Sequence, residues 1–75
     1  MVSSLQKLLS KRIVQFREAK GLSQEKLAVE AGISLRYVQY LEKGQKWAGP
    51  QTLEALSEAL GIEPWELLYP HDTKP

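Results

Sequence analysis

Apolar residues recur along the chain at the three- and four-residue spacing of amphipathic helices. The clearest series lies in the first twenty residues and comprises Leu5, Leu8, Leu9, Ile13 and Phe16. On a helix these side chains fall on one stripe, because residues three and four positions apart share a face. No segment alternates apolar and polar residues, and no Asn-Gly or Asp-Gly hairpin signal occurs. The pattern therefore predicts an all-α protein.

Serine N-caps, a proline at a helix start and glycine stops divide the pattern into five short helices. From first cap to stop residue, the expected segments are 3–21, 23–32, 34–44, 50–61 and 63–70. We expect a compact bundle over residues 1–70, followed by a disordered tail over residues 71–75. The expected core positions are Leu9, Ile13, Phe16, Leu27, Val38, Leu41, Leu53, Leu56 and Leu60.

The second and third helices lie on either side of a tight turn, in the run QEKLAVEAGISLRYVQYLEK from residue 24 to residue 43. Gly32 suits this turn because glycine adopts left-handed backbone angles without steric cost. Apolar residues occupy the positions where two crossed helices must face each other and the core: Leu27, Ala31, Ile33, Val38 and Leu41. This arrangement predicts a helix-turn-helix.

The run resembles the helix-turn-helix of lambda-type phage repressors, Cro proteins and Xre-type bacterial regulators. The resemblance extends over roughly residues 9–69, from the approach to the second helix through the fourth and fifth helices. One departure is the loop 45–49, which looks about one residue longer than in the phage repressors and holds Trp47.

The resemblance implies a sequence-specific regulator of transcription, either a repressor or an autoregulator. Such a protein binds an inverted-repeat operator in double-stranded DNA as a homodimer, with its third helix in the major groove. The expected location is the cytoplasm, and RNA polymerase is a further candidate partner. We expect no cofactor, metal or small-molecule ligand.

Candidate base contacts lie on the outward face of the third helix, opposite its apolar side. Arg36 carries the fork of donors that pairs with guanine O6 and N7, and Tyr40 follows one turn later. Leu35 is an unusual residue to expose and would suit a thymine methyl group. Gln39 has base-reading chemistry but lies nearer the flank, where a phosphate is an equal alternative. Each of these residues would otherwise be an ordinary surface side chain.

Candidate phosphate contacts lie at helix starts, where free N–H groups favour anions. The resemblance implies that Gln24, the first residue of the second helix, is a phosphate ligand. Ser34, Lys43 and Lys46 are plausible companions. These contacts position a protein on DNA without reading its sequence.

Two further groups of residues have structural roles. The resemblance implies an ion pair between Arg17 and Glu42 that joins the first and third helices. Trp65, Leu68 and Tyr69 occupy the region where related repressors dimerise. A partner subunit is the expected support for so small a core, because a chain without cysteine can form neither a disulfide nor a thiolate metal site.

Charge is divided between the two parts of the chain. Residues 1–50 hold nine Lys/Arg and four acids, a balance of +5, whereas residues 51–75 hold one lysine and five acids, a balance of −4. Such asymmetry is typical of a protein with one face toward phosphates, although solvated helix surfaces account for it equally well.

The same residues argue against other functions. The single histidine, His71, lies in the expected tail, and no Gly-rich phosphate loop or metal-ligand spacing is present, so an enzyme is not expected. No apolar run reaches the 18 residues of a membrane span. The main alternative is a protein-interaction module, such as an antitoxin or adaptor, which would expose an apolar groove. An activator presenting Glu25 and Glu30 to RNA polymerase and a restriction–modification controller are further alternatives.

Overall fold

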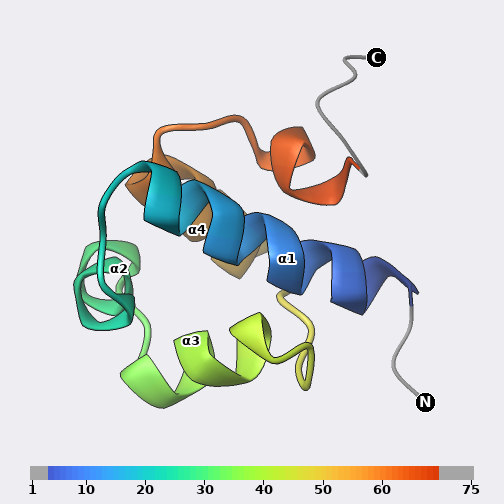
Figure 1. Ribbon diagram of the computed structural model, residues 1–75, viewed down its shortest axis with the longest axis horizontal. Helices are drawn as coiled ribbons and strands as arrows, with labels where there is room; N and C mark the ends of the chain where they lie inside the picture. Colours follow the sequence, from blue (N-terminus) through green and yellow to red (C-terminus); the bar gives the residue numbers. More distant parts are fainter. Residues whose placement is uncertain (1–3, 70–75) are drawn as a thin grey trace.

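The computed structural model describes residues 4–69 and confirms the all-α fold (Figure 1). Its elements are α1 (Ser4–Ala19), α2 (Gln24–Ala31), α3 (Leu35–Glu42), α4 (Pro50–Leu60) and a 3-10 helix, η1 (Pro64–Leu68). The sequence allows either Ser3 or Ser4 as the cap of the first helix. Of these, Ser3 lies outside the described residues, as do the expected stop at Pro70 and the expected tail 71–75 with His71.

The ends of the two motif helices follow from local side-chain chemistry. Ser23 and Ser34 are the N-caps of α2 and α3, and each hydroxyl accepts a hydrogen bond from the backbone N–H three residues later, at 3.0 Å. Gly32 ends α2 with φ 70°, a conformation that L side chains rarely adopt. The N–H of Ile33 then donates to Ala28 O at 3.0 Å, which closes the turn. The predicted helix-turn-helix is therefore present.

The fifth helix differs from the expectation of a fifth α-helix, because Pro64–Leu68 forms a 3-10 helix. Short helical segments of a few residues commonly adopt the tighter 3-10 form, and this one has five residues. Its start is stabilised by a capping box in which the backbone N–H of Glu63 donates to Glu66 Oε2 at 2.9 Å.

The core contains every position expected from the apolar pattern. Seven of the nine are buried, whereas Phe16 and Leu53 are partly buried and pack against the cluster. Ala48 and Leu67, which the pattern did not single out, are fully buried. Leu5 is 53% exposed, so the apolar stripe of α1 continues beyond the part that the core covers.

Helix α1 packs against both α3 and η1, whereas α2 packs against α3 and α4. In Figure 1, α3 and η1 lie on opposite sides of α1. Arg36 and Lys43 lie on and just after α3, and Glu66 lies on η1 across the molecule.

Arg12 attaches η1 to α1. This arginine is buried, with 6% of its surface exposed, and its Nε donates to the backbone oxygen of Glu66 at 3.0 Å. Its guanidinium also donates to Gln15 Oε1 at 3.0 Å and lies 4.8 Å from the centre of the Phe16 ring. The position of η1 thus depends on a charged side chain within the apolar stripe of α1.

Arg17 and Glu42 attach α3 to α1. Arg17 Nε donates to Glu42 Oε2 at 2.6 Å, Nη2 donates to Oε1 at 3.2 Å, and Nη1 donates to Leu22 O at 2.8 Å. The side chains are only 14% and 7% exposed. The hydrogen bond to Glu42 raises the pKa of Arg17 above its ordinary value, and this outweighs the opposing effect of burial. Because a raised pKa favours the folded state at every pH below the ordinary pKa of arginine, this stabilisation persists throughout the neutral range.

We predict that Glu42→Ala lowers the free energy of unfolding by about 3 kcal/mol, because it leaves the Arg17 guanidinium buried without its counter-ion. Urea unfolding at a fixed protein concentration measures the loss. Glu54→Ala, which removes an exposed acid from α4, is the matched control and should unfold like the parent chain. Equal stability of Glu42→Ala and Glu54→Ala would contradict the prediction.

Candidate nucleic-acid interface

Two cations dominate the outward side of α3. Arg36 and Lys43 are exposed, and neither side chain forms a hydrogen bond or ion pair with any described residue. The opposite side of the helix is anchored by Val38 and Leu41, which are buried to 0% and 1% exposure. A short helix held on its apolar side thus presents a guanidinium and an ammonium group to a partner.

Gln24 and Gln39 belong to a hydrogen-bonded chain that begins at the buried ion pair. Gln24 Nε2 donates to Glu42 Oε1 at 2.8 Å, and Gln39 Nε2 approaches Gln24 Oε1 at 3.5 Å. A carboxylate only accepts hydrogen bonds, so Glu42 determines which way the Gln24 amide points. Both glutamines are half-buried, in contrast to the free side chain of Arg36.

The two candidates at the start of α3, Leu35 and Ser34, differ in exposure. Leu35 was expected to be exposed, but it is half-buried and packs against the core cluster. This corrects the expectation in part, because burial of apolar area draws the side chain inward and leaves only part of it for a thymine methyl. Ser34 is exposed, and its hydroxyl already accepts the capping hydrogen bond from Tyr37 N–H.

The loop between α3 and α4, residues 43–49, lies against α3. Lys46 Nζ lies 5.4 Å from the centre of the half-buried Tyr40 ring, and the hydroxyl of Tyr37 donates to the backbone oxygen of Trp47 at 3.0 Å. Lys46 is therefore close to the outward side of α3. The loop thus brings the phosphate candidate Lys46 next to the base candidate Tyr40 of α3.

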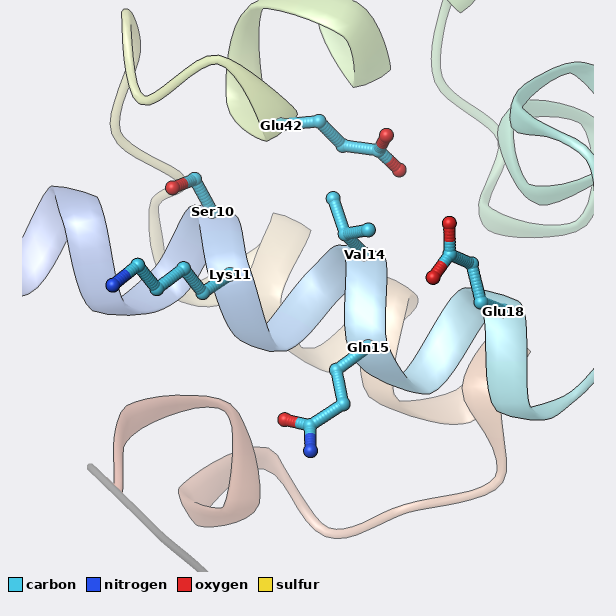
Figure 2. Close-up of a pocket in the computed structure, with 6 residues that line it drawn as sticks. All are labelled: Ser10, Lys11, Val14, Gln15, Glu18 and Glu42. Atoms are coloured by element: carbon cyan, nitrogen blue, oxygen red, sulfur yellow. The ribbon is translucent and has the colours of Figure 1, made fainter.

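A depression of about 350 Å³ lies between α1 and α3. In Figure 2, the side chain of Glu42 extends over Val14, while Gln15 points away from Glu42. The remaining lining residues are polar or charged: Ser10, Lys11 and Glu18. No group of three or more metal-ligating side chains occurs among residues 4–69. The depression therefore resembles the open border of two packed helices.

The aromatic residues of η1 form a separate surface. The rings of Trp65 and Tyr69 meet edge to face, with centroids 5.1 Å apart and planes at 86°. Trp65 is 38% exposed, and Leu68 is half-buried against the core cluster. Leu67 and the Arg12–Glu66 contact hold this segment to the bundle.

The expected site residues thus form two groups in space. The candidates for DNA contact gather on α3, at the start of α2 and in the adjoining loop, whereas the candidates for dimerisation lie on η1 and directly after it, at Tyr69. Sequence reasoning missed Arg12, Tyr37 and Trp47 as residues that hold these surfaces in place. A signal for Arg12 existed, because this charged residue occupies a position of the apolar stripe of α1.

No helix among residues 4–69 combines the length and the apolar character needed to cross a membrane. The helix-turn-helix family model matches residues 13–67. An HTH-type transcriptional regulator of Sinorhizobium fredii, y4dJ, is 35% identical over 71 residues, which are 95% of this chain and 92% of that protein.

Control protein C.BamHI of Bacillus amyloliquefaciens is 33% identical, over 91% of this chain and 85% of that protein. The crystal structure of the restriction-modification controller protein C.AhdI from Aeromonas hydrophila matches with a TM-score of 0.80 and 40% identity, over 83% of this chain and 94% of that one. These similarities confirm the resemblance to Cro- and Xre-type proteins. The chain belongs to the helix-turn-helix family of DNA-binding transcriptional regulators, which are not enzymes.

Proposed function

We propose that this protein is a repressor or autoregulator that binds an inverted-repeat operator as a homodimer, with α3 in the major groove. The observation that carries the proposal is the outward side of α3, where Arg36 and Lys43 are exposed and have no partner among the described residues. An α-helix fits the major groove, and a guanidinium there pairs with guanine O6 and N7.

In this proposal some residues around α3 contact bases and others contact phosphates. Arg36 is the principal base contact, and Tyr40 is the second. Gln39 and the accessible part of Leu35 lie at the border of the base-reading surface. Gln24, Ser34, Lys43 and Lys46 contact phosphates and set the position of α3 along the groove: Gln24 and Ser34 at the starts of α2 and α3, Lys43 and Lys46 at the far end of α3.

The homodimer is proposed to form through Trp65, Leu68 and Tyr69. An exposed tryptophan and an adjoining tyrosine are typical anchors of protein interfaces. Their side of the molecule is opposite α3, so pairing there would leave both recognition helices free (Figure 1). A two-fold dimer of this kind binds half-sites about 34 Å apart, one turn of DNA.

The control of a restriction–modification system is one task that this proposal includes. Two relatives with substantial coverage are described as a control protein and a restriction-modification controller protein. A dimeric regulator of this kind would respond to its own concentration, because operator occupancy rises with the amount of dimer.

Two alternatives have less support. An interaction module would need a continuous apolar groove, but the exposed large apolar residues of the described chain lie on different elements: Leu5, Val29, Trp47 and Trp65. An activator would present Glu25 and Glu30 on α2, where Glu30 already lies 4.0 Å from Lys26 Nζ. Neither arrangement accounts for the unpaired cations of α3.

Selection of bound duplexes from a random pool tests the function as a whole. We predict enrichment of an inverted repeat whose half-site centres are about 10 base pairs apart, because one turn of DNA separates the two recognition helices. Failure to retain any duplex at low ionic strength would contradict DNA binding, and enrichment of single half-sites would contradict the dimer.

Arg36 and Lys43 should differ in what they contribute. We predict that Arg36→Ala costs about 1–3 kcal/mol on the selected duplex and relaxes the preference at one base pair. Lys43→Ala should weaken selected and scrambled duplexes alike and lower the slope of log K against log salt by about one. Fluorescence anisotropy of labelled duplexes measures both effects. Equal losses of Arg36→Ala on the two duplexes would refute its role in base reading.

The molar mass of the protein in solution tests the proposed dimer. At micromolar concentration, light scattering should give twice the 8.5 kDa of the chain. Trp65→Ala should shift the equilibrium toward monomer by about tenfold or more, the loss expected for a buried aromatic anchor. Val29→Ala, which truncates a 75% exposed side chain on α2, is the control and should leave the mass unchanged. A monomeric parent chain would overturn this assignment.

A further inference from the structure

The first turns of α1 carry apolar side chains that the rest of the bundle leaves partly uncovered. Leu5 is 53% exposed and Leu8 is half-buried. Spacings of three and four residues place Leu5, Leu8 and Arg12 on one side of the helix. That side faces η1, because Arg12 Nε donates to the backbone oxygen of Glu66. In Figure 1 the N-terminal turns of α1 extend beyond η1. The apolar side of α1 therefore continues past the segment that covers it.

The proposed dimer surface on η1 is small by itself. Trp65 is 38% exposed, and Leu68 and Tyr69 are half-buried. A large aromatic side chain offers about 150–250 Å² when it is fully exposed, so these three partly covered side chains expose roughly 200 Å² together. Even a small specific interface buries about 600 Å² per partner, of which somewhat more than half is apolar. A dimer through η1 therefore needs further apolar surface on the same side of the molecule.

The charges of the two segments are opposite. Helix α1 has exposed lysines at Lys7 and Lys11 and no acid before Glu18, and Lys11 neighbours Leu8 because the two are three residues apart. Residues 51–69 hold four acids and no lysine or arginine, and Glu63 is the N-cap of η1. An interface that paired η1 only with the η1 of its partner would bring acids toward acids, which is unfavourable. Pairing the first turns of α1 with the η1 of the partner would instead bring lysines toward acids.

We propose that the first turns of α1 form the second half of the homodimer interface, with Leu5 and Leu8 packed against the partner's Trp65 and Tyr69. This inference rests on the proposed function and deepens it, because it names the surface that η1 meets. The two halves lie side by side, so a two-fold axis that runs between them brings each half against the other half of the partner. Every contact then occurs twice in the dimer.

A second copy of the chain is the occupant that fits both halves at once. The α1 half is apolar with basic neighbours, and the η1 half is apolar and aromatic with acidic neighbours, so each half complements the other. Self-complementarity also requires that the halves keep a fixed relative position. Arg12 supplies this, because its buried guanidinium on α1 holds the backbone of Glu66 on η1 at 3.0 Å. Arg12 is therefore a positioning residue of the proposed interface.

Paramagnetic broadening between subunits tests the contact directly. The chain has no cysteine, so Leu5→Cys accepts a single nitroxide label. The labelled protein is mixed with the parent chain enriched in nitrogen-15, so that only amides of the unlabelled partner are observed. We expect the signals of residues 64–69 to broaden and those of α2 to keep their intensity. Val29→Cys, which places the label on an exposed position of α2, is the matched control and should leave residues 64–69 unbroadened.

The dimer dissociation constant supplies the second measurement, by sedimentation equilibrium. Leu5→Ala should raise it about tenfold, because part of a leucine contact is lost at two places in each dimer. Val29→Ala should leave it unchanged, and the circular dichroism of both variants should match the parent chain.

The outcomes separate this inference from the proposed dimer. If the parent chain dimerises and Trp65→Ala weakens the dimer, but residues 64–69 stay unbroadened and Leu5→Ala associates normally, the inference is overturned and the dimer through η1 stands. If the parent chain is monomeric at the concentration of the magnetic resonance sample, both the inference and the proposed dimer fail.

Discussion

The carboxylate of Glu42 is the point at which three helices are joined. Glu42 lies at the end of α3 and accepts hydrogen bonds from Arg17 of α1 and Gln24 of α2. The side chain is only 7% exposed, so the charge is stable there because the guanidinium neutralises it and the two donors replace lost water. Three helices of modest length thereby acquire one fixed relative orientation. In the proposed function, the outward side of α3 would enter the major groove only while that orientation is kept.

Helix α1 also connects α3 to the opposite side of the molecule. Helix α1 carries Arg17 toward α3 and Arg12 toward η1, so a single helix supports both the candidate DNA surface and the candidate dimer surface. A dimeric regulator depends on the separation of its two recognition helices, since half-sites on DNA recur at a fixed distance. In the proposed dimer, α1 would act as the rigid spacer that defines this distance. Two arginines thus have structural roles, although the composition counts them simply as positive charges.

Around α3 the polar side chains fall into two classes. Arg36 and Lys43 have no partner in the described chain, whereas Gln24, Gln39, Lys46 and Tyr40 are in contact with other residues. A free cation loses only hydration and side-chain entropy when it meets a phosphate or a base. A side chain that already contacts another residue loses less entropy when it binds DNA, but it must keep that contact or exchange it for the new one.

The sequence by itself determined the local structure of this protein. Ser23, Ser34 and Gly32 predict their caps and turn because each acts on backbone groups within a few residues, and the apolar spacing predicts Leu9, Leu27 and Leu56 as core for the same reason. The pairing of Arg17 with Glu42 entered only through the family resemblance, since 25 residues separate the two partners. Tertiary structure alone decided that Arg12 reaches Glu66, that Gln24 and Gln39 extend from Glu42, and that Tyr37 supports Trp47. These contacts join residues on different helices, and the distance between them depends on how all the helices pack. The spacing of apolar residues along the chain gives no information about that distance.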